Sequence, residues 1–168
     1  MNPTKEKFLK LKLETGIDYL QEIGCDDIEQ ADRPLTAHLL GTHAILSVWG
    51  QPESVCIAGL LHALYGSDSE PQLIHPTPRR EEVQRRFGKE VESLVYEYSR
   101  RSGIDDATSK VSLIHLASLA EEALYKSSLL TRPLEKQLSK LNHPLPPHVE
   151  AWMQNFTASL HTSLRRKN

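Results

Sequence analysis

The sequence has few of the features that identify common functional classes. Its 168 residues include two cysteines, Cys25 and Cys56, which form neither a CxxC pair nor a disulfide framework. Aromatic residues make up 6%, and no stretch shows the alternating β-branched pattern of strands. The 20 lysines and arginines nearly balance 22 aspartates and glutamates, so we expect no nucleic-acid partner.

Long apolar runs are also missing. The longest, Val55 to Tyr65, contains His62 and falls short of the roughly 18 residues that a membrane span needs. The first residues are charged every few positions and lack the apolar region of a secretory signal. We therefore expect a cytoplasmic protein with no membrane partner, in which Cys56 is a small buried hydrophobic residue.

Helical periodicity runs along the whole chain. It predicts helices near 4–23, 34–49, 53–66, 79–87, 89–102, 106–128, 131–141 and 146–164, with breaks at glycines and prolines. The sequence contains no repeat, no P-loop and no GxGxxG pattern. We expect one all-α domain over residues 1–168, a bundle of seven or eight helices in which helices 131–164 pack on the rest.

Eight histidines are the one unusual count, since imidazoles titrate near neutrality and bind metals. On a helix over 35–49, His38 lies at the edge of the apolar face, and His43 lies about 140° away. His62 is the only strongly polar side chain in a run that is apolar on all sides, which indicates a buried helix. A buried imidazole needs partners, so His62 either bonds a backbone carbonyl or takes part in a site with His38.

Two motifs and their order resemble the HD-domain superfamily of metal-dependent phosphohydrolases. The first is His38, then 23 intervening residues, then Ala-Gly-Leu-Leu-His62. The second is the segment Arg80–Val95, which contains Phe-Gly-Lys-Glu-Val. The likeness is greatest to the hydrolase domain of the RelA/SpoT alarmone enzymes and covers roughly 33–125. The string from His38 to Gly66 also resembles a smaller, uncharacterised HD-like branch.

The resemblance implies a metal held by two histidines and two aspartates, and this chain departs from that set. Ala63 stands where the aspartate of the His-Asp pair is expected, and Ser118 where the distal aspartate is expected. Gly66 and Ser67 replace an acidic pair, with Asp68 one position later. Carboxylates offset the charge of the metal and fix its geometry, so the standard two-carboxylate chemistry is not expected here.

Other residues could complete a site around the two histidines. His115 and Glu122 lie on the same helix face as Ser118, and a metal (Mn, Fe or Zn) held by His38, His62 and His115, or with Glu122 as third ligand, is conceivable. The apolar face of this helix carries Leu116, Ala120, Ala123 and Leu124, so the alternative is that His115, Ser118 and Glu122 form a solvated or cleft-lining face.

For ligand binding, the candidates beside His38 and His62 are Tyr65, Asp68 and Arg33. Tyr65 and Asp68 follow His62, and Arg33 precedes His38 where the resemblance implies a basic residue that helps to hold a nucleotide. His75 is a reserve candidate, while His43, His143, His148 and His161 are expected on ordinary surfaces or loops. Four arginines at 79, 80, 85 and 86 alternate with glutamates, which indicates a salt-bridged surface helix.

Three functions remain open from the sequence. One is an HD-like protein that binds a small nucleotide-like or phosphate-containing molecule near His38 and His62 without phosphohydrolase chemistry. Another is a metal-dependent enzyme, a phosphohydrolase or an iron oxygenase, with an altered ligand set. The third is a helical interaction module, which predicts no cavity beside the two histidines. The sequence leaves substrate, metal and oligomeric state undetermined, because fold likeness does not transfer function when site residues differ.

Overall fold

The computed structural model describes residues 3–30, 32–66, 74–101, 106, 109–126, 134, 136, 138–139, 141 and 144–165, with only the backbone for 3–11, 126 and 160–165. Within these ranges the chain is all-α, as predicted, with seven α-helices and no β-strand. Asp68, His143 and most of the predicted helix 131–141 lie outside the described residues.

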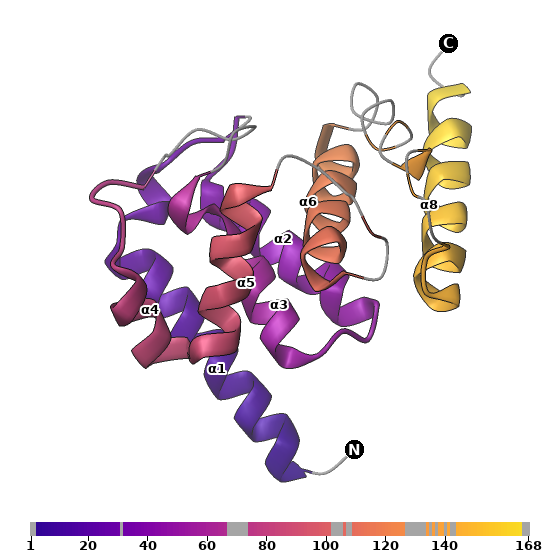
Figure 1. The fold of residues 1–168 in the computed structure, drawn as a ribbon. Helices are drawn as coiled ribbons and strands as arrows, with labels where there is room; N and C mark the ends of the chain where they lie inside the picture. Colours follow the sequence, from indigo (N-terminus) through magenta and orange to yellow (C-terminus); the bar gives the residue numbers. More distant parts are fainter. Residues whose placement is uncertain are drawn as a thin grey trace.

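The helices follow the predicted order (Figure 1). They are α1 (Pro3–Glu22), α2 (Leu35–Val48), α3 (Glu53–Leu60), α4 (Arg80–Phe87), α5 (Lys89–Arg100), α6 (Lys110–Lys126) and α8 (Pro147–Arg165), with 3₁₀ turns η1 (Cys25–Asp27) and η2 (His62–Tyr65). Gly50 and Gly88 take positive φ angles at helix ends, 63° and 94°, where other residues would be strained.

Two predicted helix boundaries are wrong. The helix expected over 53–66 ends at Leu60, where the amide of Leu61 is shared between the carbonyls of Ile57 and Ala58, and the chain tightens into η2. The helix expected from 106 begins at Lys110. The first difference matters most, because it places His62 on a 3₁₀ turn at the end of the buried helix.

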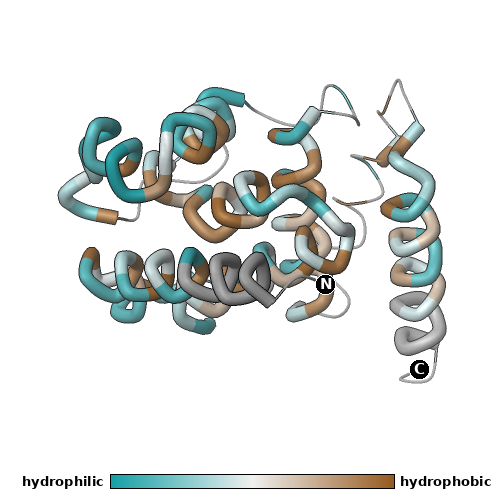
Figure 2. The backbone as a smooth tube through the Cα atoms, turned by 90° about the horizontal axis from the view of Figure 1, so that it is seen from below, coloured by the Kyte–Doolittle hydropathy of each residue, from teal (hydrophilic) through white to brown (hydrophobic). Residues whose placement is uncertain are grey.

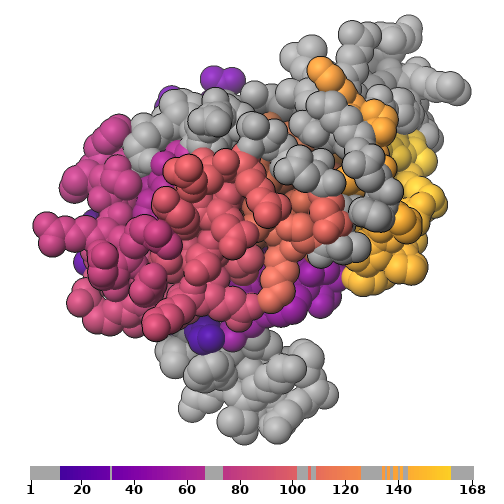
Figure 3. Space-filling model, viewed as in Figure 1, coloured from indigo at the N-terminus to yellow at the C-terminus, as the bar shows by residue number. Residues whose placement is uncertain are grey.

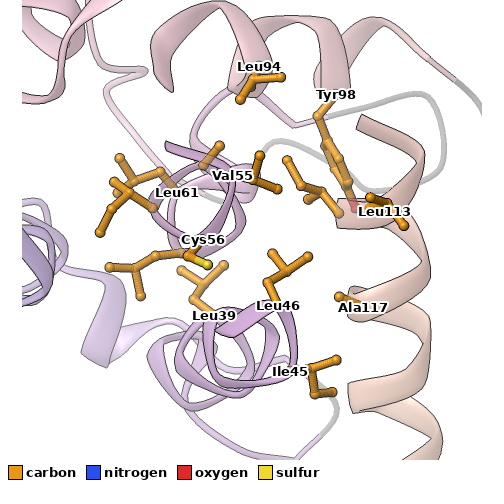
Figure 4. Close-up of a cluster of buried hydrophobic side chains, with 14 of the residues drawn as sticks. Leu39, Ile45, Leu46, Val55, Cys56, Leu61, Leu94, Tyr98, Leu113 and Ala117 are labelled. Atoms are coloured by element: carbon orange, nitrogen blue, oxygen red, sulfur yellow. The ribbon is translucent and has the colours of Figure 1, made fainter. Parts of the chain in front are cut away.

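The core lies where α2, α3, α5 and α6 meet, and α2 makes its most extensive contacts with α3 and α6. Leu46 of α2, Val55 of α3, Leu94 of α5 and Ala117 of α6 point into the shared interior (Figure 4). Cys56 is buried there as a small apolar group, as predicted. Along the backbone, hydrophobic stretches lie in the middle of the bundle and hydrophilic ones around its rim (Figure 2).

Glycine at position 59 permits the close contact between α2 and α3. A Cβ at Gly59 would lie 3.5 Å from the Thr42 methyl carbon and would overlap the Leu46 side chain. This contact holds α3, and therefore His62 beyond its end, against the helix that carries His38.

The arginine-rich helix α4 is paired with acidic residues, as predicted, but its main partners lie on other helices. Arg86 pairs with Glu82 at 3.5 Å and with Glu22 of α1 at 2.7 Å. Arg80 donates two hydrogen bonds to Glu92 of α5, whose side chain is fully buried, and Gln84 donates a third at 2.9 Å. These pairs attach α4 to α1 and α5.

The C-terminal helix α8 lies at one side of the molecule, next to α6 in Figure 1 and at the right-hand edge of Figure 3, beyond α6. Its Trp152 meets Trp49 edge-on at 5.4 Å, and His148 bonds the Trp49 carbonyl at 2.9 Å. None of the described helices combines the length and apolar character that crossing a membrane requires.

Candidate functional site

His38 and His62 come together in the interior, as their sequence positions predict. Their exposed fractions are 1% and 0%, and their rings meet edge-on with centroids 5.2 Å apart. A buried imidazole needs hydrogen-bond partners, and the Nδ1 atom of each ring has one. These two histidines are the centre of a polar cluster that α2, η2, α5 and α6 enclose.

The Nδ1 atom of His62 lies 2.7 Å from the carbonyl oxygen of Gly59. A carbonyl only accepts, so Nδ1 carries the proton and donates it. This is the backbone-bonded core histidine that the sequence offered as one of two interpretations. In a neutral ring the lone pair then lies on Nε2.

His38 is bonded on both ring nitrogens by side chains of α6. Nδ1 lies 2.5 Å from Oε2 of Glu121, and Nε2 lies 3.2 Å from the Ser118 hydroxyl. Because a carboxylate accepts, Nδ1 is the donor and Nε2 of a neutral ring accepts from Ser118. Ser118, at the position where the resemblance implies the distal aspartate, is therefore the hydrogen-bond partner of Nε2 of His38.

Glu121 is the carboxylate at the centre of this network, and sequence reasoning missed it. Arg33 forms a fork on it, with one guanidinium nitrogen 2.5 Å from Oε1 and the other bonded to Oε2. Burial raises the pKa of the Glu121 carboxyl, but the bonds from His38 and Arg33 outweigh it and hold that pKa below its usual value. The carboxylate is thus ionised and fully engaged.

A glycine on α2 makes room for this carboxylate. A Cβ at Gly41 would lie 2.6 Å from Cγ and 2.7 Å from Oε1 of Glu121, closer than real side chains approach. The spacing of three residues places Ser118 and Glu121 on one face of α6, so both reach His38. Arg33, just before α2, also lies over the Tyr125 ring at 4.1 Å.

Tyr98 of α5 and His115 of α6 extend the cluster beyond His62. The Tyr98 ring lies 4.9 Å from that of His62 and stacks on that of His115 at 3.9 Å and 17°. Burial, with the charges of His62 and Arg101, lowers the pKa of His115 to about 4. Within the described residues the Nε2 atom of His115 has no hydrogen-bond partner.

The sequence offered a solvated or cleft-lining face for α6 as one alternative, and two of its three residues are not solvated. His115 is 7% exposed and Ser118 is 2% exposed, because α6 packs against α2, α3 and α5 at once. Glu122 is half-buried. Leu124, expected on the apolar face, is 49% exposed, whereas Leu116, Ala120 and Ala123 are buried as predicted.

The remaining candidates lie around or outside the cluster. Tyr65 is half-buried with its ring 6.2 Å from Tyr96, and within the described chain its hydroxyl has no hydrogen-bond partner. Burial and the charge of Glu92 raise its pKa. His75 is exposed, and His43 is half-buried with a pKa lowered by burial. The ligand role of Tyr65 stays a prediction.

The donor set fits a protein-held metal poorly. No group of three or more His, Cys, Asp or Glu side chains in the described chain is arranged to hold an ion. Ala63 offers no donor atom, and Glu121 is bonded to Arg33 and His38. The three-ligand set of His38, His62 and His115 therefore stays a prediction that the described geometry does not favour.

A family model matches part of the chain. Residues 19–101 match a family described as a domain of unknown function, DUF6817. No curated protein compared with the chain matches it. The matched segment includes Arg33, His38, His62 and Tyr98 but stops before α6, which supplies the carboxylate and the hydroxyl of the cluster.

Proposed function

We propose that this chain is a divergent HD-like domain that binds a small polar ligand and lacks phosphohydrolase chemistry. The likeness is supported by helices in the expected order and by the meeting of His38, His62 and position 118 from three separate elements. In the resemblance, these are positions that hold the metal. Here Ser118 is hydrogen-bonded to His38, and the His62 ring lies edge-on to the His38 ring.

The observation that carries the proposal is the state of Glu121. A hydrolytic metal site needs carboxylates that offset the metal's charge and hold its geometry. The carboxylate nearest to His38 instead accepts bonds from the Arg33 fork and from the ring itself. Its charge is already paired with Arg33 and His38, so Glu121 does not replace the aspartates missing at Ala63 and Ser118.

The same contact suggests what the ligand would be. An arginine fork matches a phosphate as well as a carboxylate, because both present paired oxygens. Arg33 keeps 12% of its side chain exposed, at the edge of the buried cluster. A phosphate-containing ligand would bind there by taking one or both guanidinium nitrogens from Glu121.

The test measures binding and turnover on the same protein. Pyrophosphate and nucleoside diphosphates are titrated by calorimetry into the wild-type chain and into Glu121→Gln, which frees the Arg33 fork. We expect tighter binding to the variant, by about tenfold for one recovered charged hydrogen bond. We also expect no phosphate release from these ligands with added Mn²⁺.

Two results would contradict the proposal. Mn²⁺-dependent phosphate release that disappears in His62→Ala would make the chain a phosphohydrolase after all. Absence of binding to both the wild type and Glu121→Gln would favour a helical interaction module. Arg33→Gln serves as the matched control. Combined with Glu121→Gln, it removes the fork and should abolish any binding gained in Glu121→Gln alone.

A metal-dependent enzyme is the second candidate, and the tautomers of the two histidines favour it. His38 and His62 both donate from Nδ1, one to a carboxylate and one to a backbone carbonyl. Metal-binding histidines are usually oriented by such bonds, which leave Nε2 to face the ion, and an ion here would replace the Ser118 hydroxyl at Nε2 of His38. Metal analysis after purification without chelator decides this point. Less than a tenth of an equivalent of Mn, Fe or Zn, unchanged on metal addition, would exclude it.

A further inference from the structure

A pocket of about 370 Å³ lies between α8 and the chain that precedes it, and no residue of the histidine cluster lines it. One wall is apolar and comes from Leu138, Leu141 and Leu145. The other wall is the side of α8 that carries Glu150, Met153 and Gln154. This volume falls in the range of small-molecule sites, about 300–1,000 Å³.

The spacing of residues on α8 explains why a hollow forms here. Positions 150, 153 and 154 share one face of a helix, while Val149, Trp152 and Phe156 turn toward the bundle. Met153 lies between the two faces, 3% exposed, and forms the floor of the pocket. The site therefore rests on packed residues at one end and opens to solvent at Glu150.

Among the described residues that line the pocket, Glu150 carries the one charge available to a ligand. Gln154 donates a weak bond of 3.4 Å to Oε1 of Glu150, and the Thr157 hydroxyl donates back to the Met153 carbonyl at 3.0 Å. No ion pair to Glu150 is found in the described chain, and none of the described lining residues carries a positive charge. The described part of the pocket therefore has apolar walls and a single carboxylate at its opening.

We infer that this pocket binds a small apolar molecule carrying one positive charge, of the aryl-alkyl amine class. Its apolar part would displace water from the leucine wall and Met153, and its ammonium group would pair with Glu150. An apolar carboxylic acid of the same size would meet repulsion from Glu150. This inference is independent of the function proposed for the histidine cluster.

Methionine labelling gives a direct readout. The chain has two methionines, Met1 and Met153, so ¹³C-methyl-methionine protein shows few methyl signals, and Met153→Leu identifies the one from the pocket. We would titrate 4-phenylbutylamine, 4-phenylbutanol and 4-phenylbutyrate, which share one apolar part and differ in charge. We expect the amine to bind about fivefold more tightly than the alcohol, and the acid to bind more weakly than the alcohol.

The matched variant is Glu150→Gln, which keeps the shape and removes the charge. We expect it to bind the amine and the alcohol equally and to leave the alcohol affinity unchanged, while exposed Glu97→Gln on α5 changes nothing. Three results would overturn the inference: no ligand shifts the Met153 methyl signal, the acid binds as well as the amine, or the preference for the amine survives in Glu150→Gln.

Discussion

At the scale of single residues, the pKa of His115 makes stability depend on pH. The folded pKa of about 4 lies below the ordinary 6.5, so the folded state excludes a proton that the unfolded chain binds. Stability from this group is complete above pH 6.5, falls as the pH drops toward 4, and changes no further below that. Between pH 7 and pH 5 we expect a loss of about 2 kcal/mol.

Urea unfolding at both pH values measures this loss, and His115→Phe is the control. Phenylalanine keeps a flat ring to stack on Tyr98 but cannot titrate. The carboxylates with lowered pKa, Glu92 and Glu121, stay ionised over this range and do not add to the difference. If wild type and His115→Phe lose equal stability between pH 7 and pH 5, His115 is not the group responsible.

The Glu121 carboxylate also predicts a stability difference. Glu121→Ala leaves the guanidinium of Arg33 and the Nδ1–H of His38 without their acceptor in a buried place, which should cost about 3 kcal/mol. Glu90→Ala is the comparison, because its pair with Lys110 is exposed on both sides and should contribute less than about 1 kcal/mol. Chemical denaturation of both variants gives the comparison, and equal losses would mean that the buried network stabilises no more than a surface pair.

Sequence reasoning found the two histidines but not their partners. His38 and His62 stand out because each is a polar residue in an apolar pattern. Glu121 lies 83 residues from His38 and 88 from Arg33, and no local pattern distinguishes it from Glu122 beside it. The available signal was the spacing of three between Ser118 and Glu121, which places a carboxylate on the face of the implied ligand position.

At the scale of elements, α6 shows where periodicity fails. The prediction assumed one apolar face and one solvent-exposed face. This assumption is correct for a helix that packs against neighbours on one side only. Residues 111–118 are all buried, because α2, α3 and α5 surround that half of the helix. A polar residue such as Ser118 or His115 is accommodated there by bonding or stacking on another polar group, and this depends on helices distant in sequence.

The contact between α2 and α6 predicts that Gly41→Ala is destabilising. Alanine favours helix by about 1 kcal/mol over glycine, so an unconstrained position would become more stable. Here the added Cβ overlaps Cγ and Oε1 of Glu121, and we expect a net loss of about 2 kcal/mol as the network shifts.

A double-mutant cycle separates the two effects. In a Glu121→Ala background the overlapping atoms are gone, so Gly41→Ala should become neutral or stabilising. Thermal unfolding of the four proteins supplies the cycle. An unchanged penalty in that background would show that something other than the approach of Glu121 excludes a side chain at position 41.

At the scale of the whole molecule, the fold class was the most predictable property. Helical periodicity and glycine breaks placed most helices within a few residues, because each local pattern agrees with the bundle. The cluster was less predictable, since it combines the loop before α2, η2, α5 and α6. The segment that matches the domain of unknown function holds both histidines but ends before α6. The match therefore covers only part of the cluster.

The docking of α8 on the bundle gives a prediction at this scale. Trp152 packs edge-on against Trp49 and stacks on Phe156 at 5.0 Å, so it is the main aromatic link between α8 and the end of α2. Trp152→Ala should lower the free energy of unfolding by about 2 kcal/mol, less than for a fully buried tryptophan because the side chain is half-buried.

Fluorescence then reports on the docking directly. The chain has two tryptophans, so Trp152→Ala leaves Trp49 as the single emitter. Trp49 is 1% exposed while α8 covers it, and we expect its emission to shift to longer wavelength as α8 moves away. Trp152→Phe retains a ring against Trp49 and should keep most of the stability and the shorter-wavelength emission. If Trp152→Ala matches the wild type in stability and Trp49 emission stays at short wavelength, then α8 remains docked without Trp152, and the tryptophan pair is not what holds it on the bundle.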